Sequence, residues 1–280
     1  MISIVIPALN ESKLLPGCLQ SLKNQDYAGE YEIIVVDNGS TDDTADIARS
    51  FGVRVIPCPD KRSVIHARQA GADAAGGDII IQADADTVYP EWWLKRIADR
   101  LAAQPEAVAI SGRYFYRDAF FWAKVEYAVR YGINRITAAL FGRPILISGA
   151  TFAFRRSAFL SLNGYRGLSF SADQYGISGR LRQRGKVLYD RNLYVFTSAR
   201  RVQKPTIELI GDIIANLGRW AAYLGQSNLS GLQQSLTRTP ARRALIRFAP
   251  LPVLMFSLVL VVPRRKRSPG KLSRDEAWKT

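Results

Sequence analysis

Two acidic residues stand one position apart at the end of an apolar run in the stretch GGDIIIQADADT, residues 76–87. If this run forms a strand, Asp84 and Asp86 point to the same side of it, because side chains alternate along a strand. Two neighbouring carboxylates repel each other, and a hard divalent cation relieves that repulsion while it also binds phosphate oxygens. The pair therefore predicts a cation site that holds a phosphorylated ligand. The alternative interpretation is that Asp84 only ends the strand and Asp86 caps the next helix.

The elements that must position these acids are visible as apolar runs that alternate with helix-like segments. Ser40 and Asp43 have the spacing of a capping box at the start of one such helix, and Gly52 is expected to end it. Near-continuous apolar strands indicate a parallel sheet that is covered by helices. The predicted strands are residues 2–7, 31–37, 53–57 and 78–84, each followed by a helix.

Polar side chains follow three of these predicted strands. In open sheets of this kind ligands bind outside the carboxyl ends of the strands. The sequence therefore predicts that three separate segments deliver polar groups to one edge of the sheet. These groups are Asn10 and Glu11, Asp37 and Asn38, and Asp84 and Asp86.

Composition restricts the classes of site. The 280 residues suffice for one large domain or two small ones. Cys18 and Cys58 are the only cysteines and His66 is the only histidine, so neither a disulfide framework nor a zinc site is indicated. With no histidine or cysteine in the acidic stretch, Mg²⁺ or Mn²⁺ suits the acids better than zinc.

Charge is distributed unevenly along the chain. Residues 1–110 contain 10 Lys and Arg against 16 Asp and Glu, whereas residues 111–280 contain 29 against 8. The basic second part predicts an anionic partner, which could be a nucleic acid, a phosphorylated ligand or a membrane surface.

The second half is less regular. Residues 116–142 predict a long aromatic and basic helix, and residues 147–165 a short strand followed by a helix. Residues 170–190 predict a loop that carries Asp173, then a basic helix and a strand. Residues 204–225 have the pattern of an amphipathic helix.

The two ends of the chain bear on its location. The first residues show no basic leader, so we expect the catalytic part to stay in the cytoplasm. Near the other end, residues 248–262 are 15 uncharged residues between basic clusters. A membrane-spanning helix needs about 20 apolar residues, which leaves three interpretations open: a re-entrant or interface-lying segment, a spanning segment, and an ordinary buried helix.

Four segments together carry a resemblance to a known family. SIVIPALNES, EIIVVDNGSTDDT, ARQAGADAAGGDIIIQADADT and ADQYGISGRLRQRGKV are similar to the motifs of inverting family 2 glycosyltransferases, which have a GT-A fold. The resemblance covers about residues 1–190. It implies an α/β fold with a twisted, mostly parallel sheet that is covered by helices. The expected organisation is a nucleotide-sugar-binding half (1–112), an acceptor-binding half of the same domain (113–200), and amphipathic and hydrophobic C-terminal helices with a basic tail (201–280).

The resemblance also assigns roles to individual positions. Asp86 is expected to be the principal metal ligand on the donor diphosphate, and Asp84 to reach the ribose or the metal. The metal is expected to be Mg²⁺ or Mn²⁺. The nucleotide-sugar site is expected to comprise Pro7, Leu9, Glu11, Asp37, Asn38, Arg62, Asp84, Ala85 and Arg113.

A catalytic base is expected from the fourth segment. In the family, the Asp of a Glu-Asp pair before a basic helix deprotonates the acceptor hydroxyl. Asp173 matches that Asp, although Ala172 replaces the Glu. The alternative interpretation is that Asp173 is a helix N-cap.

The predicted function is a membrane-associated, metal-dependent glycosyltransferase of cell-envelope glycan or glycolipid synthesis. It would move a sugar, with inversion, from a nucleotide-diphosphate sugar to a hydroxyl or lipid-phosphate acceptor. The acceptor could be a polyprenyl phosphate, a glycolipid or a polysaccharide. The expected location is the cytoplasmic face of an anionic membrane.

Three other classes of protein would explain some of these features. A nucleic-acid-binding protein would explain the basic charge, but no such motif is found and the strand ends are acidic, so no nucleic-acid partner is expected. A dinucleotide enzyme is excluded because no G-x-G-x-x-G follows the first strand. An inactive homologue that only binds nucleotide sugars stays open because of Ala172 and Asn38.

Overall fold

The computed structural model describes residues 1–58, 63–118, 120–141, 148–168, 173–200 and 203. The chain divides into two compact units. The first comprises Met1–Ala128 and Leu146–Gln203, and the second Val129–Ile145 and Lys204–Thr280. Within the second unit only residues 129–141 are described, and they form the end of one helix.

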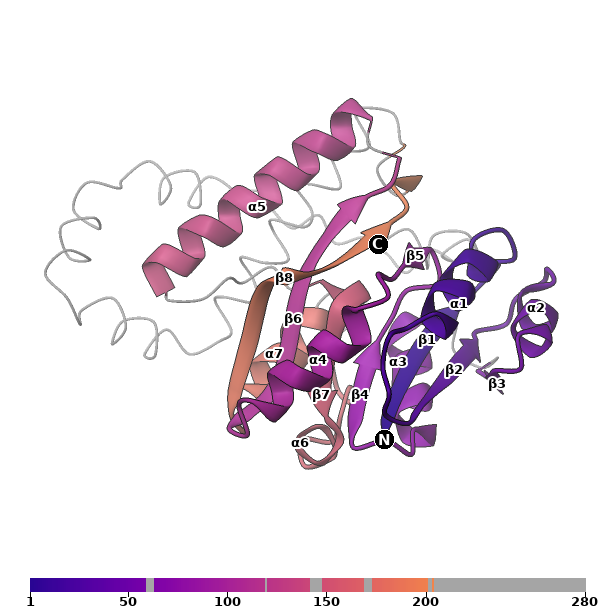
Figure 1. Ribbon diagram of the computed structural model, residues 1–280, viewed down its shortest axis with the longest axis horizontal. Coiled ribbons are helices and arrows are strands. Elements are labelled where there is room, and N and C mark those ends of the chain that lie inside the picture. Colours follow the sequence, from indigo (N-terminus) through magenta and orange to yellow (C-terminus); the bar gives the residue numbers. More distant parts are fainter. Residues whose placement is uncertain (59–62, 119, 142–147, 169–172, 201–202, 204–280) are drawn as a thin grey trace, which may run out of the picture. The chain divides into compact units, whose positions relative to one another are not determined.

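An eight-stranded sheet forms the centre of the first unit (Figure 1), in the order β3-β2-β1-β4-β7-β6-β8-β5. The β3-β2-β1-β4 part is parallel throughout, as the sequence predicts. The strands are β1 (Ile2–Ala8), β2 (Tyr31–Asp37), β3 (Arg54–Pro57), β4 (Ile79–Gln82), β5 (Thr87–Val88), β6 (Ala107–Tyr116), β7 (Phe152–Arg155) and β8 (Lys186–Thr197).

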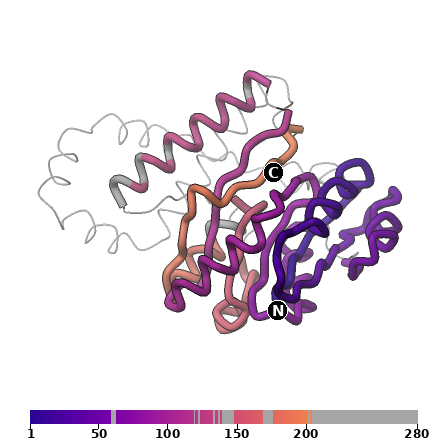
Figure 2. Tube along the Cα trace, viewed as in Figure 1, coloured from indigo at the N-terminus to yellow at the C-terminus, as the bar shows by residue number. Residues whose placement is uncertain are grey.

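The rest of the sheet is mixed, so the prediction of a mostly parallel sheet is wrong for the second half. β7 is antiparallel to both β4 and β6, and β5 is antiparallel to β8. β6 and β8 are parallel and run side by side over most of their length (Figure 2). The reason is the route of the chain, because β7 enters between β4 and β6 from the opposite direction.

Helices cover both faces of the sheet. One apolar cluster contains side chains of α1, α2 and α4, and the other contains side chains of α3, α6 and α7. Neighbouring positions of β1 alternate between the two clusters, as the two-residue period of a strand requires. The helices are α1 (Leu15–Lys23), α2 (Thr44–Ser50), α3 (Val64–Ala74), α4 (Trp93–Ala102), α5 (Phe121–Phe141), α6 (Arg156–Leu160) and α7 (Asp173–Leu181), with a 3₁₀ helix at Gly149–Thr151.

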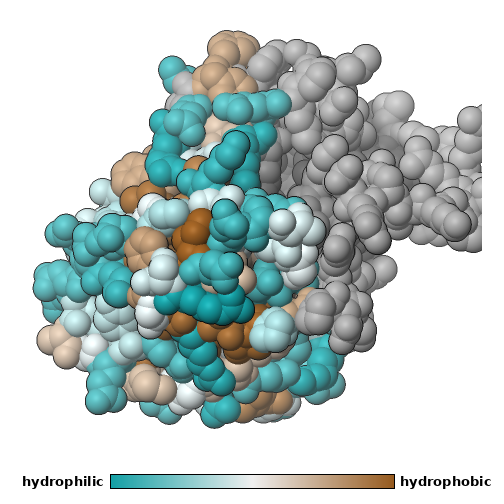
Figure 3. All heavy atoms as spheres, turned by 90° about the vertical axis from the view of Figure 1, so that its right-hand side faces the viewer, coloured by the Kyte–Doolittle hydropathy of each residue, from teal (hydrophilic) through white to brown (hydrophobic). Residues whose placement is uncertain are grey.

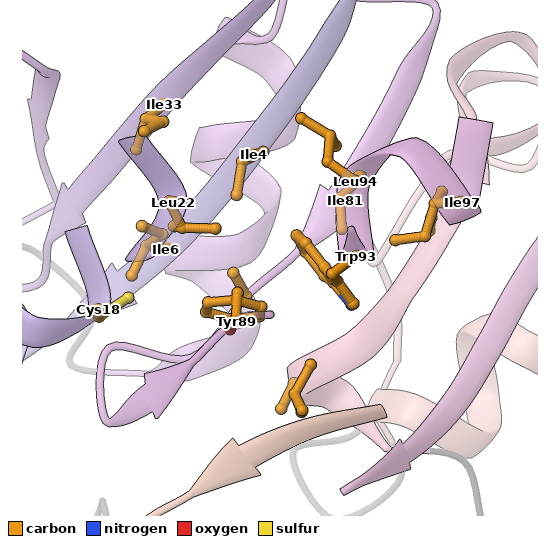
Figure 4. Packing of buried hydrophobic residues seen from close by; sticks show 14 of the residues in the cluster. Ile4, Ile6, Cys18, Leu22, Ile33, Ile81, Tyr89, Trp93, Leu94 and Ile97 are labelled. Carbon is orange, nitrogen blue, oxygen red and sulfur yellow. The ribbon is translucent and has the colours of Figure 1, made fainter. Parts of the chain in front are cut away.

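The exterior of the described part is mainly hydrophilic, and its interior is apolar. On the face shown in Figure 3, hydrophilic side chains dominate the described part and hydrophobic atoms form separate smaller areas. Inside, the rings of Tyr89 and Trp93 lie 4.4 Å apart between centroids, beside Ile4 and Ile81 (Figure 4). The indole N–H of Trp93 donates to the hydroxyl of Thr151 at 3.0 Å, so its buried polar atom has a partner.

The acidic stretch does not end as a strand. β4 stops at Gln82, and Asp84 and Asp86 lie on the following turn, where the N–H of Thr87 donates to the carbonyl of Asp84 at 3.2 Å. The chain turns here because Thr87 and Val88 leave to pair with β8. The two acids are therefore not on alternate positions of one strand, and that step of the sequence argument is wrong.

Three helix boundaries also differ from expectation. The helix predicted over 116–142 begins at Phe121, because β6 continues to Tyr116. Asp173 is the first residue of α7, rather than part of a preceding loop. The prediction of a capping box is wrong. Asp43 makes no side-chain capping bond, and the hydroxyl of Ser40 instead accepts the N–H of Asn10. The predicted end of α2 at Gly52 is confirmed by its φ of 68°.

The predicted C-terminal segments, residues 204–225 and 248–262, lie outside the described residues. None of the helices in the described ranges combines the length and hydropathy that crossing a bilayer requires.

Candidate functional site

The loops after β1 and β2 are joined at the carboxyl edge of the sheet. The N–H of Asn38 donates to the carbonyl of Ala8 at 2.9 Å, and the side chain of Asn10 accepts the N–H of Thr41 at 2.8 Å. The N–H of Glu11 donates to the hydroxyl of Thr44 at 2.8 Å. The backbone that carries Glu11 is therefore fixed by the neighbouring loop.

Asp84 faces a basic residue from α3. Its Oδ1 lies 3.3 Å from a guanidinium nitrogen of Arg68, whose side chain is only 7% exposed. The backbone N–H of Asp84 donates to the hydroxyl of Tyr89 at 2.8 Å. A buried arginine is normally paired, so Arg68 and Asp84 define each other's position.

Asp86 is more deeply buried and is held from β8. Its Oδ1 accepts the hydroxyl of Thr197 at 3.2 Å, while its Oδ2 lies 3.2 Å from Nε of Arg200. The carbonyl of Asp86 accepts the backbone N–H of Ser198 at 3.2 Å. The carboxylate is only 5% exposed, and the end of β8 therefore completes its surroundings.

Arg200 connects two of the strand ends. Besides Asp86, its guanidinium binds the carboxylate of Glu11. Burial acts to lower the pKa of Arg200, but the hydrogen bonds and charges of Glu11 and Asp86 outweigh burial and raise that pKa. The guanidinium is therefore a permanent positive charge between these two acids.

A buried thiol lies next to the acids. Cys18 of α1 is 1% exposed, and its Sγ lies 3.5 Å from the carbonyl oxygen of Asp84. Burial, and then the negative charges of Asp86, Asp84 and Glu11, raise the pKa of this thiol well above its ordinary value. The three acids are thus close enough to act on one group, and Cys18 stays protonated.

The predicted nucleotide residues at the ends of β1, β2 and β4 lie at this same edge. Pro7 and Ala85 are buried, Leu9 is half-buried, and Asn38 is fully buried. The carboxylate of Asp37 accepts the N–H of Ser40 at 3.1 Å.

The remaining predicted residues are placed less directly. Arg113 lies on β6 with its guanidinium 5.4 Å from the ring centroid of Phe115, and none of its described contacts is with the acids. Asp173 begins α7, with only its backbone described. Arg62 lies outside the described residues.

The acids fit a hard divalent cation in part. Asp84 and Asp86 offer carboxylate oxygens, which Mg²⁺ and Mn²⁺ prefer. No three His, Cys, Asp or Glu side chains in the described ranges are arranged to hold a metal. A cation here therefore needs phosphate oxygens or water as further ligands, which is common for Mg²⁺.

The sequence interpretation missed the basic partners of the site. Arg68 lies on a helix, where it reads as an ordinary polar position, and its partner Asp84 is 16 residues away. Arg200 lies 114 residues after Asp86. Only the placement of β8 beside β6 and β5 brings it to the acids, and no local pattern signals that placement.

Comparisons with known proteins bear on the family and the fold. A family model described as glycosyl transferase family 2 matches residues 3–162. An N-acetylglucosaminyltransferase of Rhizobium leguminosarum bv. viciae is 29% identical over 175 residues, which are 58% of this chain and 40% of the relative. A PGL/p-HBAD biosynthesis glycosyltransferase of Mycobacterium bovis (strain BCG) is 35% identical over 127 residues, or 43% and 49%. The chain thus spans less than half the length of these relatives.

Two solved structures have a similar fold. A mannosyltransferase from Pyrobaculum calidifontis in complex with GDP-Man and Mn²⁺ superposes with a TM-score of 0.62 at 19% identity, covering 92% of this chain and 73% of that one. Glucosyl-3-phosphoglycerate synthase from Mycobacterium tuberculosis, in complex with Mn²⁺, UDP-glucose and phosphoglyceric acid, gives 0.57 at 22% identity and covers 80% of each chain.

Proposed function

The chain belongs to glycosyl transferase family 2 and has a GT-A fold, and on that premise we propose that it transfers a sugar from a nucleotide-diphosphate donor to an acceptor with inversion. The observation that carries the proposal is the meeting of Glu11, Asp84 and Asp86 at the carboxyl ends of β1 and β4. Ligands bind at this edge in open α/β sheets.

Donor binding is proposed to use a divalent cation. Asp86, with Asp84 beside it, would hold Mg²⁺ or Mn²⁺, which would stabilise the negative charge of the departing diphosphate. The loops after β1 and β2 would contact the nucleoside through Asp37, Asn38 and Glu11. Support for this assignment comes from the Mn²⁺ and nucleotide sugars in the two similar structures.

Acceptor activation is assigned to Asp173. The backbone of α7 begins at this residue, and a carboxylate there would accept the proton of an acceptor hydroxyl. The acceptor is proposed to be a polyprenyl phosphate, a glycolipid or a polysaccharide of the cell envelope. Which of these it is depends on the shape of the acceptor site.

The proposed location is the cytoplasmic face of an anionic membrane. The charge of the second half supports this proposal, as do two exposed aromatic side chains of the first unit. Phe121 is 68% exposed at the start of α5, and Phe196 is 37% exposed near the end of β8. Lys124 is exposed in the same part of the sequence. Aromatic and basic side chains together favour the headgroup region of a bilayer.

Thermal unfolding with candidate donors tests the proposal. We expect GDP-mannose or UDP-glucose, with Mn²⁺, to raise the melting temperature, because a ligand that binds only the folded state stabilises it. Asp86→Ala is expected to abolish both this shift and sugar transfer to the acceptor panel. Asp78→Ala is the control, since Asp78 is exposed and pairs only with the N-terminal amine among the described contacts.

Two results would contradict the proposal. One is full transfer activity in the presence of a chelator, which would refute the metal role. The other is donor binding with no transfer to any acceptor class, which would favour an inactive nucleotide-sugar-binding homologue.

A further inference from the structure

One guanidinium forms ion pairs with two carboxylates that follow different strands. Arg200 follows β8, whereas Glu11 follows β1 and Asp86 follows β4. Nε of Arg200 lies 3.2 Å from Oδ2 of Asp86, and a terminal nitrogen of the same side chain binds Glu11. These are charge-assisted hydrogen bonds, which are stronger than neutral ones.

Arg200 lies against a carboxylate oxygen that a metal ion on Asp86 would use. Asp86 has two carboxylate oxygens, of which one accepts the hydroxyl of Thr197 and the other faces Arg200. A divalent cation on Asp86 would lie against a fixed positive charge, and like charges at contact distance repel strongly in a site shielded from water. Arg200 and a metal ion therefore cannot both hold Asp86 without a further anion.

The Arg200 side chain can leave Asp86 without disturbing the sheet. The Arg200 side chain is 39% exposed, whereas Asp86 and Glu11 are 5% and 11% exposed. Arg200 lies beyond the last residue of β8, so withdrawing its side chain breaks no strand pairing. The hydroxyl of Thr197 binds the other carboxylate oxygen of Asp86, so it would still hold that carboxylate after the guanidinium had left.

We propose that Arg200 is an internal competitor of the metal ion: in the donor-free protein it neutralises Asp86 and Glu11, and a divalent cation that arrives without a donor must displace it from Asp86. The inference rests on the proposed function in one respect, namely that Asp86 is the metal ligand. It adds a consequence for donor binding. The metal binds weakly by itself and tightly with a donor, because the diphosphate supplies the negative charge that two neighbouring cations require.

The test is a titration of the full chain with Mn²⁺ alone, without donor, followed by the electron paramagnetic resonance signal of free Mn²⁺. Arg200→Gln removes the charge and keeps most of the side-chain length. We expect its Kd for Mn²⁺ to be lower than that of the wild type by about tenfold or more, since a hydrogen bond to a charged group contributes that much. Arg200→Lys keeps a positive charge, so its Kd for Mn²⁺ should stay closer to that of the wild type than the Kd of Arg200→Gln does.

Matched controls separate this effect from a general change in charge. Arg191→Ala removes an exposed arginine from β8 and is expected to leave the Kd unchanged. Asp86→Asn should abolish the binding that Arg200→Gln strengthens. The Mn²⁺-induced rise in melting temperature is a second readout, expected to be larger in Arg200→Gln, and it also shows that the variant is folded. Arg200→Ala repeats the measurement with a different replacement.

Two outcomes overturn the inference. If Arg200→Gln and Arg200→Ala bind Mn²⁺ as the wild type does while Asp86→Asn loses binding, then Arg200 does not compete. If Asp86→Asn binds Mn²⁺ as tightly as the wild type, then the ion is not on Asp86. The proposed sugar transfer is judged separately, by product formation with nucleotide sugars, so its failure is distinguishable from either result.

Discussion

At the scale of single residues, the proposed mechanism depends on a carboxylate at the start of α7. Asp173→Asn removes the carboxylate and keeps a side chain of nearly the same size and polarity, so it separates a catalytic role from a structural one. We expect donor binding near that of the wild type and transfer reduced by about 10²–10⁴-fold, the usual contribution of a general base. Donor-induced melting shifts measure the first quantity and product formation the second.

A different pair of results would reassign Asp173. If Asp173→Asn loses donor binding, the residue belongs to the nucleotide site. If both binding and transfer persist, it is a helix cap only. Asp173→Ala is a useful companion, because it also removes the polar group: if Asp173 caps α7, Asp173→Ala should lower the melting temperature where Asp173→Asn does not.

At the scale of elements, an ion-pair cluster joins α4 to β8, the strand that leads to Arg200. Asp190 accepts two hydrogen bonds from Arg96, at 3.0 and 3.1 Å, and lies 3.3 Å from Arg100. Burial acts to raise the pKa of Asp190, but the bonds from Arg96 and the N–H of Asn192, with the charges of both arginines, outweigh it and lower that pKa. Protonating Asp190 therefore costs stability.

The sign of the pH dependence follows from this direction. Because the pKa of Asp190 is lower in the folded than in the unfolded state, its contribution is fully present above about pH 4 and is lost as the pH falls through the folded value. Asp190→Asn should lower the free energy of unfolding by about 1–3 kcal/mol at pH 7. The difference from the wild type should shrink toward pH 3.

Urea unfolding at both pH values checks this prediction. Asp99→Asn on α4, the helix that carries Arg96 and Arg100, is the control. Asp99 pairs with Lys95, and both side chains are more than half exposed. Exposed pairs of this kind contribute little to stability. An Asp190→Asn variant as stable as the wild type at pH 7 would refute the role of the cluster.

The sequence predicts those elements that depend on neighbouring residues, and it does not predict those that depend on pairing between distant segments. β1, β2 and β3 lie where their apolar runs predict them, and Glu11, Asp84 and Asp86 lie at one edge because parallel strands bring their carboxyl ends together. The turn after Gln82 could not be predicted, since it depends on the pairing of β5 with β8, about 110 residues away. The contact of Arg200 with Asp86 could not be predicted for the same reason, since the two residues are far apart in the sequence.

At the scale of the whole molecule, the formal net charge of +15 is the property most relevant to location. We expect the full chain to sediment with vesicles that contain anionic phospholipid and not with purely zwitterionic vesicles, because each Lys or Arg near an anionic surface contributes about 1 kcal/mol. High salt should release it if attachment is electrostatic. Persistence on the vesicles in high salt would favour an apolar segment in the bilayer, and binding to neither type would refute membrane attachment.

The unequal burial of the two cysteines has a practical consequence. Cys18 is buried next to the acids, and its raised pKa keeps the thiol protonated. Cys58 is half-buried directly after β3, and its backbone N–H donates to the carbonyl of Asp37 at 2.7 Å. A maleimide fluorophore should therefore attach selectively at Cys58 in the natural chain. Such a probe would lie beside the loop that follows β2, where binding of the proposed nucleotide donor should alter its emission without any engineered reporter.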